Sequence, residues 1–411
     1  MSNAHNYEDL IRRFETMLQT NEIYFFDLED FLTIIEHYIN SGDYNLAQKA
    51  IKSGLNQHNN NVDILLYKAE LYSLKDQLEN AEKLLGYLSD LEPERLEIPM
   101  LEAEIYSRQN LHEKAIEALQ QALNLPGADP TEIYEMMTVE YLYMDRYNEA
   151  LNTSIKALKH DPESSMSLFN AVSCYDLTNR PDDAIIFLEN FLDKNPFSEV
   201  GWSLLAKKYI DNGQYHKALE AIDFAIAIDD KFLAAYYDKA YIFSKLRRYE
   251  EALIFYKITL DIADPTAFTY YHIARIYQRM NDVKHATKYF LKAINEDPGH
   301  FKSWIKLVEL KIENNEWQSA LEIAQRASEI VSHQELFELL GDIHIHFKNW
   351  NEAISAFEMS LKLGDANLPD IIKLSDLYKR TKQIEKFRNL LLKAKQQFPD
   401  SKEIQSLMSG S

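Results

Sequence analysis

The sequence has a single cysteine, Cys174, and few helix-breaking residues, with 10 glycines and 11 prolines among 411 residues. One cysteine cannot form a disulfide framework within the chain or a metal site built from cysteines. We expect Cys174 to be a small buried hydrophobic residue. No apolar run approaches the roughly 18 residues that predict a membrane span. The sequence therefore favours a helical protein without disulfides and without membrane insertion.

The N-terminus has no basic segment followed by an apolar block, so the sequence shows no signal peptide. We therefore expect a cytoplasmic location by default. The opening Ser2-Asn3-Ala4 resembles the remnant of an expression tag. Removal of a native leader thus stays an alternative.

The chain is acidic, with a formal net charge of −21, and this charge lies in its first half. Residues 1–200 hold 15 Lys and Arg against 36 Asp and Glu, whereas residues 201–411 hold 29 of each. The negative electrostatic potential of this acidic half repels nucleic acid and anionic membranes. We expect no nucleic-acid partner, and the simpler interpretation of the charge is a solubilising surface.

The strongest pattern in the sequence is a repeat. One small residue, alanine, recurs at intervals of 33 to 35 residues along most of the chain. Its positions are Ala47, Ala81, Ala115, Ala150, Ala184, Ala218, Ala252, Ala286, Ala320 and Ala353, and Phe387 takes the eleventh place. A period in this range is typical of a solenoid.

Other positions keep the same period. An aromatic residue stands nine places before the alanine at Tyr38, Tyr72, Tyr106, Tyr141, Tyr175, Tyr209, Phe243, Tyr277 and Tyr378. A proline stands twelve places after it at Pro93, Pro162, Pro196, Pro298 and Pro399. Proline ends a helix because it lacks the N–H group and clashes with the preceding turn. Each repeat is therefore predicted to hold two helices.

Residues 199–232 show the pattern in full. The side chains spaced at three and four residues are Trp202, Leu205, Ala206 and Tyr209 in the first predicted helix, and Ala218, Ile222 and Ala225 in the second. Further copies are Trp304-x-x-Leu307 and Phe337-x-x-Leu340-Gly341. This pattern resembles the tetratricopeptide repeat. The resemblance covers about residues 28–401 and implies little about function, because many unrelated proteins use this scaffold.

The resemblance implies an all-α fold, a right-handed superhelical solenoid of tandem helix-turn-helix repeats. We expect an N-terminal tail and cap helix at residues 1–27, eleven 34-residue repeats at 28–401, and a C-terminal tail at 402–411. The apolar connector at residues 21–26 is expected to pack on the first repeat. The repeat alanines are small because neighbouring helices approach closely there. Phe387 fits a last repeat that no further repeat covers.

The sequence shows no short motif of an enzyme or cofactor site. It lacks a glycine-rich phosphate loop, a Gly-x-Ser-x-Gly motif and a His-Glu-x-x-His motif. His344 and His346 are two residues apart, so a helix would point them to different sides and they could not share a metal. We expect no catalytic residue, no metal and no cofactor, and hence a protein that is not an enzyme.

In the family that the sequence resembles, the first helix of each repeat lines a concave groove. The matching positions in the early and late repeats are acidic: Asp63, Glu70, Glu97, Glu104, Glu132 and Glu135, then Glu309, Glu313, Glu335, Glu338 and Asp342. Between them the candidate partner-binding residues are Phe169, Lys207, Tyr237, Tyr241, Phe268, Tyr271, Arg275 and Arg279, with Lys245 beside them. The aromatic residues either pack on the neighbouring repeat or anchor a bound peptide.

The preferred function is a non-enzymatic scaffold that binds a protein or an extended peptide in its concave groove, over residues 165–280. Arg275 and Arg279 are four residues apart, so one helical face could present both to a single anion. The alternative is a self-associating structural module, or an interaction domain of a larger assembly or envelope-associated complex. Homo-oligomerisation therefore stays open.

Chaperone-binding members of this family hold the partner's carboxylate with Lys and Asn from consecutive first helices. No three consecutive repeats of this sequence supply that set at the matching positions. We therefore expect no binding of chaperone C-terminal tails.

Overall fold

The structure is a computed structural model that describes residues 2–20, 23–365 and 367–409. In these residues it has 24 helices and no strand. The predicted all-α class is therefore confirmed. The chain divides into two compact units, Met1–Leu204 and Leu205–Ser411, and the division falls within helix α12 (Glu199–Asp211).

Unit 1 is the acidic half of the chain. Its helices before α12 are α1 (Ser2–Thr20), α2 (Leu28–Asn40), α3 (Tyr44–Gln57), α4 (Val62–Leu74), α5 (Leu78–Leu91), α6 (Glu97–Arg108), α7 (His112–Ala122), α8 (Pro130–Tyr143), α9 (Tyr147–His160), α10 (Ser165–Leu177) and α11 (Pro181–Leu192). After α1 they follow one another in pairs, as the repeat predicts.

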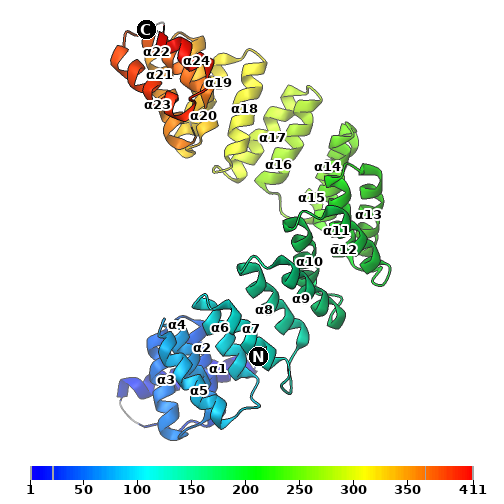
Figure 1. Ribbon diagram of the computed structural model, residues 1–411, viewed down its shortest axis with the longest axis vertical. Coiled ribbons are helices and arrows are strands. Elements are labelled where there is room, and N and C mark those ends of the chain that lie inside the picture. Colours follow the sequence, from blue (N-terminus) through cyan, green and yellow to red (C-terminus); the bar gives the residue numbers. More distant parts are fainter. Residues whose placement is uncertain (1, 21–22, 366, 410–411) are drawn as a thin grey trace. The chain divides into compact units, whose positions relative to one another are not determined.

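Unit 2 continues the same pattern. Its helices after α12 are α13 (Tyr215–Ile228), α14 (Leu233–Lys245), α15 (Tyr249–Ile262), α16 (Ala267–Arg279), α17 (Val283–Glu296), α18 (Phe301–Glu313), α19 (Trp317–Ile330), α20 (Gln334–His346), α21 (Trp350–Leu363), α22 (Leu368–Arg380), α23 (Ile384–Gln397) and α24 (Lys402–Ser409). The two helices of a repeat lie side by side, as α16 and α17 do in Figure 1.

Each turn between paired helices contains a residue in the left-handed region, five places before the repeat alanine. In six repeats this residue is Asn or Asp, and glycine fills the position in two more, as Gly213 does after α12 with φ +70°. These residue types reach this region most readily. Backbone bonds such as Gln77 N–H to Tyr72 O at 2.8 Å then close the end of the first helix.

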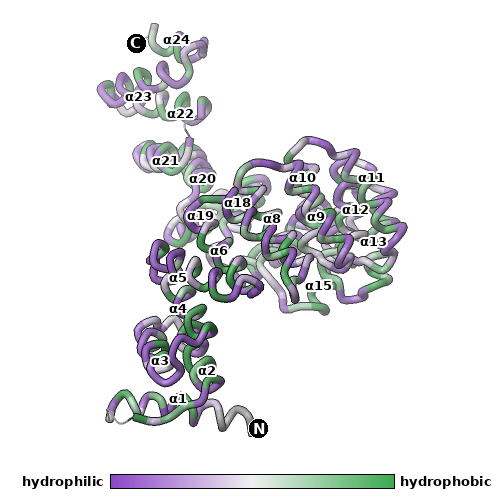
Figure 2. The backbone as a smooth tube through the Cα atoms, turned by 60° about the horizontal axis from the view of Figure 1, so that its bottom comes forward, coloured by the Kyte–Doolittle hydropathy of each residue, from purple (hydrophilic) through white to green (hydrophobic). Residues whose placement is uncertain are grey.

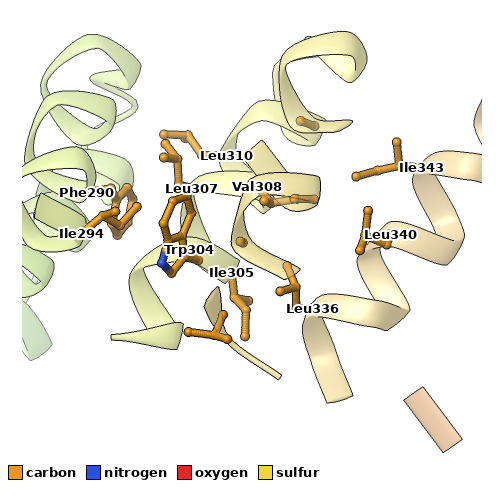
Figure 3. Close-up of a cluster of buried hydrophobic side chains, with 14 of the residues drawn as sticks. Phe290, Ile294, Trp304, Ile305, Leu307, Val308, Leu310, Leu336, Leu340 and Ile343 are labelled. Carbon is orange, nitrogen blue, oxygen red and sulfur yellow. The ribbon is translucent and has the colours of Figure 1, made fainter. Parts of the chain in front are cut away.

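The repeat alanines are all buried, at 0 to 1% exposure, and Phe387 is 2% exposed. Hydrophobic and hydrophilic residues alternate along the helices at the scale of a turn, so each helix turns one face inward (Figure 2). In unit 2, Trp304 and Leu307 of α18 lie in one cluster with Phe290 of α17 and Leu336 of α20 (Figure 3). Neighbouring repeats therefore share a continuous core.

The N-terminal segment partly follows expectation. Helix α1 covers Ser2–Thr20, within the predicted tail and cap helix at residues 1–27, and Phe14 of α1 is fully buried against the first repeat. In the connector Phe26 is buried, but Ile23 is 90% and Phe25 72% exposed. The expected packing of the connector therefore holds at its end, and residues 21–22 lie outside the described residues.

The C-terminal tail predicted at 402–411 was wrong over most of its length. Residues 402–409 form α24, whose Ile404 is 1% exposed and shares a cluster with Phe387 of α23. A short helix therefore covers the last repeat. Phe387 is large where a further helix packs, so the absence of a covering element does not explain its size.

Candidate partner-binding surface

Seven of the eight candidate residues lie on the first helices of unit 2. Tyr237 on α14 and Tyr271 on α16 stand fifteen places before their repeat alanines. Lys207, Tyr241 and Arg275, on α12, α14 and α16, stand eleven places before theirs. A separation of four residues keeps both positions on one helical face. Phe268 and Arg279 on α16 complete what we call the aromatic–cation surface.

Tyr237 and Tyr271 belong to an aromatic layer that is partly buried. The Tyr237 ring lies 5.4 Å from Phe268, edge to face, and its hydroxyl hydrogen-bonds the Thr269 hydroxyl of the next repeat. The Tyr271 ring lies 6.0 Å from Phe290 of the core. Tyr237 therefore packs on the next repeat, whereas the contact of Tyr271 with Phe290 lies within its own repeat.

Tyr241 and Phe268 are different, because much of each ring faces solvent. Tyr241 is 38% exposed and Phe268 is 51% exposed. Phe268 rests on His272, with 4.3 Å between ring centroids, and Lys245 Nζ lies 5.1 Å from the Tyr241 centroid. Large rings held in fixed positions at a surface are typical anchors for a protein partner.

Four cations accompany these rings, and among the described residues none of the four forms an ion pair: Lys207, Lys245, Arg275 and Arg279. Arg279 Nη1 donates to Ser244 Oγ of α14 at 2.6 Å, and Arg275 Nη1 donates to Gln278 Oε1 at 2.9 Å. The two guanidinium groups thus bind groups on different helices. Each retains donors for a partner, since a guanidinium has five N–H groups.

A carboxyl group that sequence reasoning missed lies on the same helices. Asp238 of α14 has a buried Oδ2 that no described residue hydrogen-bonds. Burial raises the pKa of Asp238 to about 6, although the positive charge of Lys207 acts in the opposite direction. Burial also raises the pKa of Tyr256 on α15, a phenol on which the charges of Arg279 and Asp238 act with opposite signs.

His272 occupies the equivalent position one repeat later, fourteen places before its alanine. It stacks on Tyr256 at 5.5 Å. Burial lowers its pKa to about 4, and the nearby charge of Arg275 acts in the same direction. The imidazole is therefore neutral at pH 7. This position could have been found by applying the repeat period to every polar residue on the first helices.

Phe169 is the one candidate residue of unit 1. It lies on α10 in unit 1 and is 56% exposed. The predicted contact region at 165–280 thus spans both units. Cys174 of the same helix is buried, and burial raises the pKa of its thiol to about 11, so it is a thiol at neutral pH.

The described residues contain neither a metal-ligand cluster nor a membrane-spanning helix. Among them no three His, Cys, Asp or Glu side chains come together in a way that could hold a metal ion. Within the same ranges, no helix combines the length and apolar character needed to cross a membrane.

Comparison with known proteins identifies the repeat. A family model described as tetratricopeptide repeat matches residues 100–129 and 269–300, and a second model of that description matches 204–267. Anaphase-promoting complex subunit 3 of Schizosaccharomyces pombe is 25% identical over 197 residues, which are 47% of this chain and 29% of that protein. A TPR repeat-containing protein of Methanocaldococcus jannaschii is 24% identical over 199 residues, 48% of this chain and 29% of that protein.

A third relative carries the name of an enzyme. Human protein O-mannosyl-transferase TMTC1 is 25% identical over 173 residues, 41% of this chain and 20% of that protein. The chain thus spans less than a third of the length of each of these relatives.

Two solved structures are similar to this chain at lower sequence identity. The APC/C hetero-tetramer Cut9-Hcn1 matches at a TM-score of 0.39 and 14% identity, over 99% of this chain and 93% of that chain. A tetratricopeptide repeat protein of Parabacteroides merdae matches at a TM-score of 0.43 and 15% identity, over 60% of this chain and 98% of that chain. No subfamily follows from these matches. The matched residues and the helix pairs show that the chain carries tetratricopeptide repeats.

Proposed function

We propose that this chain is a non-enzymatic scaffold that binds a protein or an extended peptide on the aromatic–cation surface of unit 2. Tetratricopeptide repeat proteins generally serve as protein-interaction scaffolds. The observation that carries the proposal is the exposure of Tyr241 and Phe268 beside cations that form no ion pair with described residues. A bound partner removes an exposed apolar ring from water, and an unpaired cation offers that partner a charged contact.

The surrounding packing explains why these rings suit a binding role. Tyr237 contacts Phe268 edge to face, and His272 contacts the same ring with 4.3 Å between centroids. A ring that is already held loses little side-chain entropy when a partner arrives. The neutral imidazole of His272 also adds no positive charge next to Arg275. The attraction for an acceptor in the partner therefore comes from the exposed cations.

The test is affinity capture with a surface variant that leaves the packed layer intact. Tyr241→Ala combined with Phe268→Ala removes the two exposed rings and should abolish capture of a partner that the wild-type chain retains. Ile254→Ala with Leu291→Ala is the matched control, because these side chains are 56% and 42% exposed on the second helices α15 and α17. Equal capture by the surface variant and the control would refute the proposal.

Light scattering over a wide concentration range addresses self-association. If the partner is another copy of this chain, the wild-type mass should rise with concentration and the Tyr241→Ala, Phe268→Ala variant should stay monomeric. A mass that rises equally in both proteins would place self-association on another surface.

A further inference from the structure

A cavity of about 340 Å³ lies in unit 1 between α3 and α4. Three lysines line it: Lys52 of α3, Lys68 of α4 and Lys75 at the end of α4. A cavity of this size is at the lower end of the range for small-molecule sites. The two helices that form it are labelled in Figure 1.

The composition of this cavity is unusual for unit 1. Acidic residues outnumber basic ones 36 to 15 in residues 1–200, yet no Asp or Glu lines the cavity. Two other cations of this unit contact carboxylates of a neighbouring helix, Arg95 with Asp63 and Arg146 with Glu113 at 2.6 Å. The three lysines form no ion pair with any described residue.

The contacts of two lysines hold their ammonium groups at the cavity without neutralising them. Lys75 Nζ donates to the neutral amide oxygen of Gln48 at 2.8 Å. Lys68 Nζ lies 5.7 Å from the ring centroid of Tyr72, in the same wall. Three positive charges around one cavity repel one another, and an anion between them would remove that repulsion.

The remaining walls indicate what else the ligand carries. Ile51 and Leu71 are buried, and Leu55 is half-buried, so one side of the cavity is apolar. Asn56 adds an amide on α3. An ammonium acts as a point charge, which suits a tetrahedral, multiply charged oxyanion, whereas planar carboxylates are matched by the arginine fork. The lining holds lysines and no arginine.

We propose that this cavity binds a phosphate monoester on an apolar or aromatic frame. The phosphate lies among Lys52, Lys68 and Lys75, and the frame lies against the apolar wall. The ligand is either a free small molecule or a phosphorylated side chain of a partner, since both present the same chemistry. This site is independent of the surface proposed for partner capture.

Isothermal titration calorimetry with phenyl phosphate tests the proposal on the full chain. Phenyl phosphate should bind more tightly than inorganic phosphate, because of the apolar wall, and more tightly than benzoate, because of its charge. Each single Lys→Gln change at Lys52, Lys68 or Lys75 should weaken binding about fivefold, and the triple change should abolish it. Lys83→Gln on α5 is the control, since Lys83 is exposed and does not line the cavity.

A second variant blocks the cavity without changing its charge. Asn56→Trp places a large side chain at its exposed rim and should also abolish binding. Circular dichroism melting should give the triple lysine variant a Tm no lower than that of the wild type, because mutual repulsion is removed. Absence of heat with phenyl phosphate, or unchanged binding by the triple variant, would overturn the proposal, as would equal affinity for benzoate.

A short peptide with one phosphotyrosine between glycines distinguishes the two sources. Tighter binding of this peptide than of phenyl phosphate assigns the phosphate to a partner protein. Equal binding assigns it to a small molecule. Both results support the proposed phosphate chemistry.

Discussion

Replacing the buried carboxyl of Asp238 with an amide should stabilise unit 2 at neutral and alkaline pH. Oδ2 of Asp238 is buried without a hydrogen-bond partner among the described residues, so the ionised form loses hydration that the charge of Lys207 offsets only in part. Asp238→Asn keeps the shape of the side chain and removes the charge. The variant therefore isolates the cost of burying this charge.

The magnitude follows from the pKa of Asp238, which burial raises from 3.8 to about 6. Because the folded pKa is the higher one, the carboxyl costs no stability below pH 3.8, and the cost grows as the pH rises through 6. Above pH 7 both states are ionised and the cost reaches about 3 kcal/mol. The buried amide also lacks a partner, which reduces the expected gain of Asp238→Asn to about 2 kcal/mol.

The assay is urea unfolding of the full chain, followed by circular dichroism at pH 8 and near pH 4. Repeat proteins can unfold in steps, so hydrogen exchange of the α14 and α15 backbone should be measured alongside. The gain of Asp238→Asn should be present at pH 8 and absent near pH 4. Asp223→Asn on α13 is the control, because Asp223 is largely exposed and paired with Lys239. Loss of this exposed ion pair should change the free energy of unfolding by less than about 1 kcal/mol.

Three neighbouring groups enter this reasoning. Lys207 on α12 lowers the pKa of Asp238, so Lys207→Met should raise it further. The phenol of Tyr256 lies near both Asp238 and Arg279, whose charges shift its pKa in opposite directions. A carboxyl carbon chemical shift of Asp238 that titrates near pH 4 would refute the reasoning, as would an equal gain from Asp238→Asn at both pH values.

Three further substitutions test the packing. Gly341→Ala should cost roughly 1–3 kcal/mol in urea unfolding, because its new Cβ would lie 2.5 Å from Cε2 of Phe357, and no change would mean that the ring moves freely. Arg247→Gly should raise stability by about 1 kcal/mol, since Arg247 has φ +61°, and Arg247→Ala should bring no such gain. Ile404→Ala should expose α23 near Phe387 to faster hydrogen exchange, whereas a frayed tail predicts no effect.

The repeat period predicts the fold because each repeat buries the same positions against its neighbours. The spacing of the alanines located eleven helix pairs, and the buried alanines confirm why they are small. The period does not predict that Tyr237 is packed and Tyr241 exposed, because both stand on one face of α14. Their difference depends on the next repeat, where the Thr269 hydroxyl hydrogen-bonds that of Tyr237, whereas Tyr241 stays 38% exposed.

Asp238 and His272 show a second limit of the sequence. Their position in the repeat also holds Leu101 and Leu204, so the residue type varies there and no consensus draws attention to it. The altered pKa values arise from burial by neighbouring repeats, which composition does not reveal. The cavity between α3 and α4 was missed for a related reason. Its lysines are ordinary surface residues in the sequence, and only packing of the two helices brings them to one space.

The helix α24 was missed although the sequence carried its signal. Ile404, Leu407 and Met408 are spaced three and four residues apart, which is the pattern of a helical face. They follow Pro399, where the repeat pattern ends, so the period alone predicts no helix there. The last helix pair of a solenoid still has an apolar face to cover. Ile404 covers it beside Phe387, so the eleventh position accepts a large side chain because its neighbour is a short helix and not a full repeat.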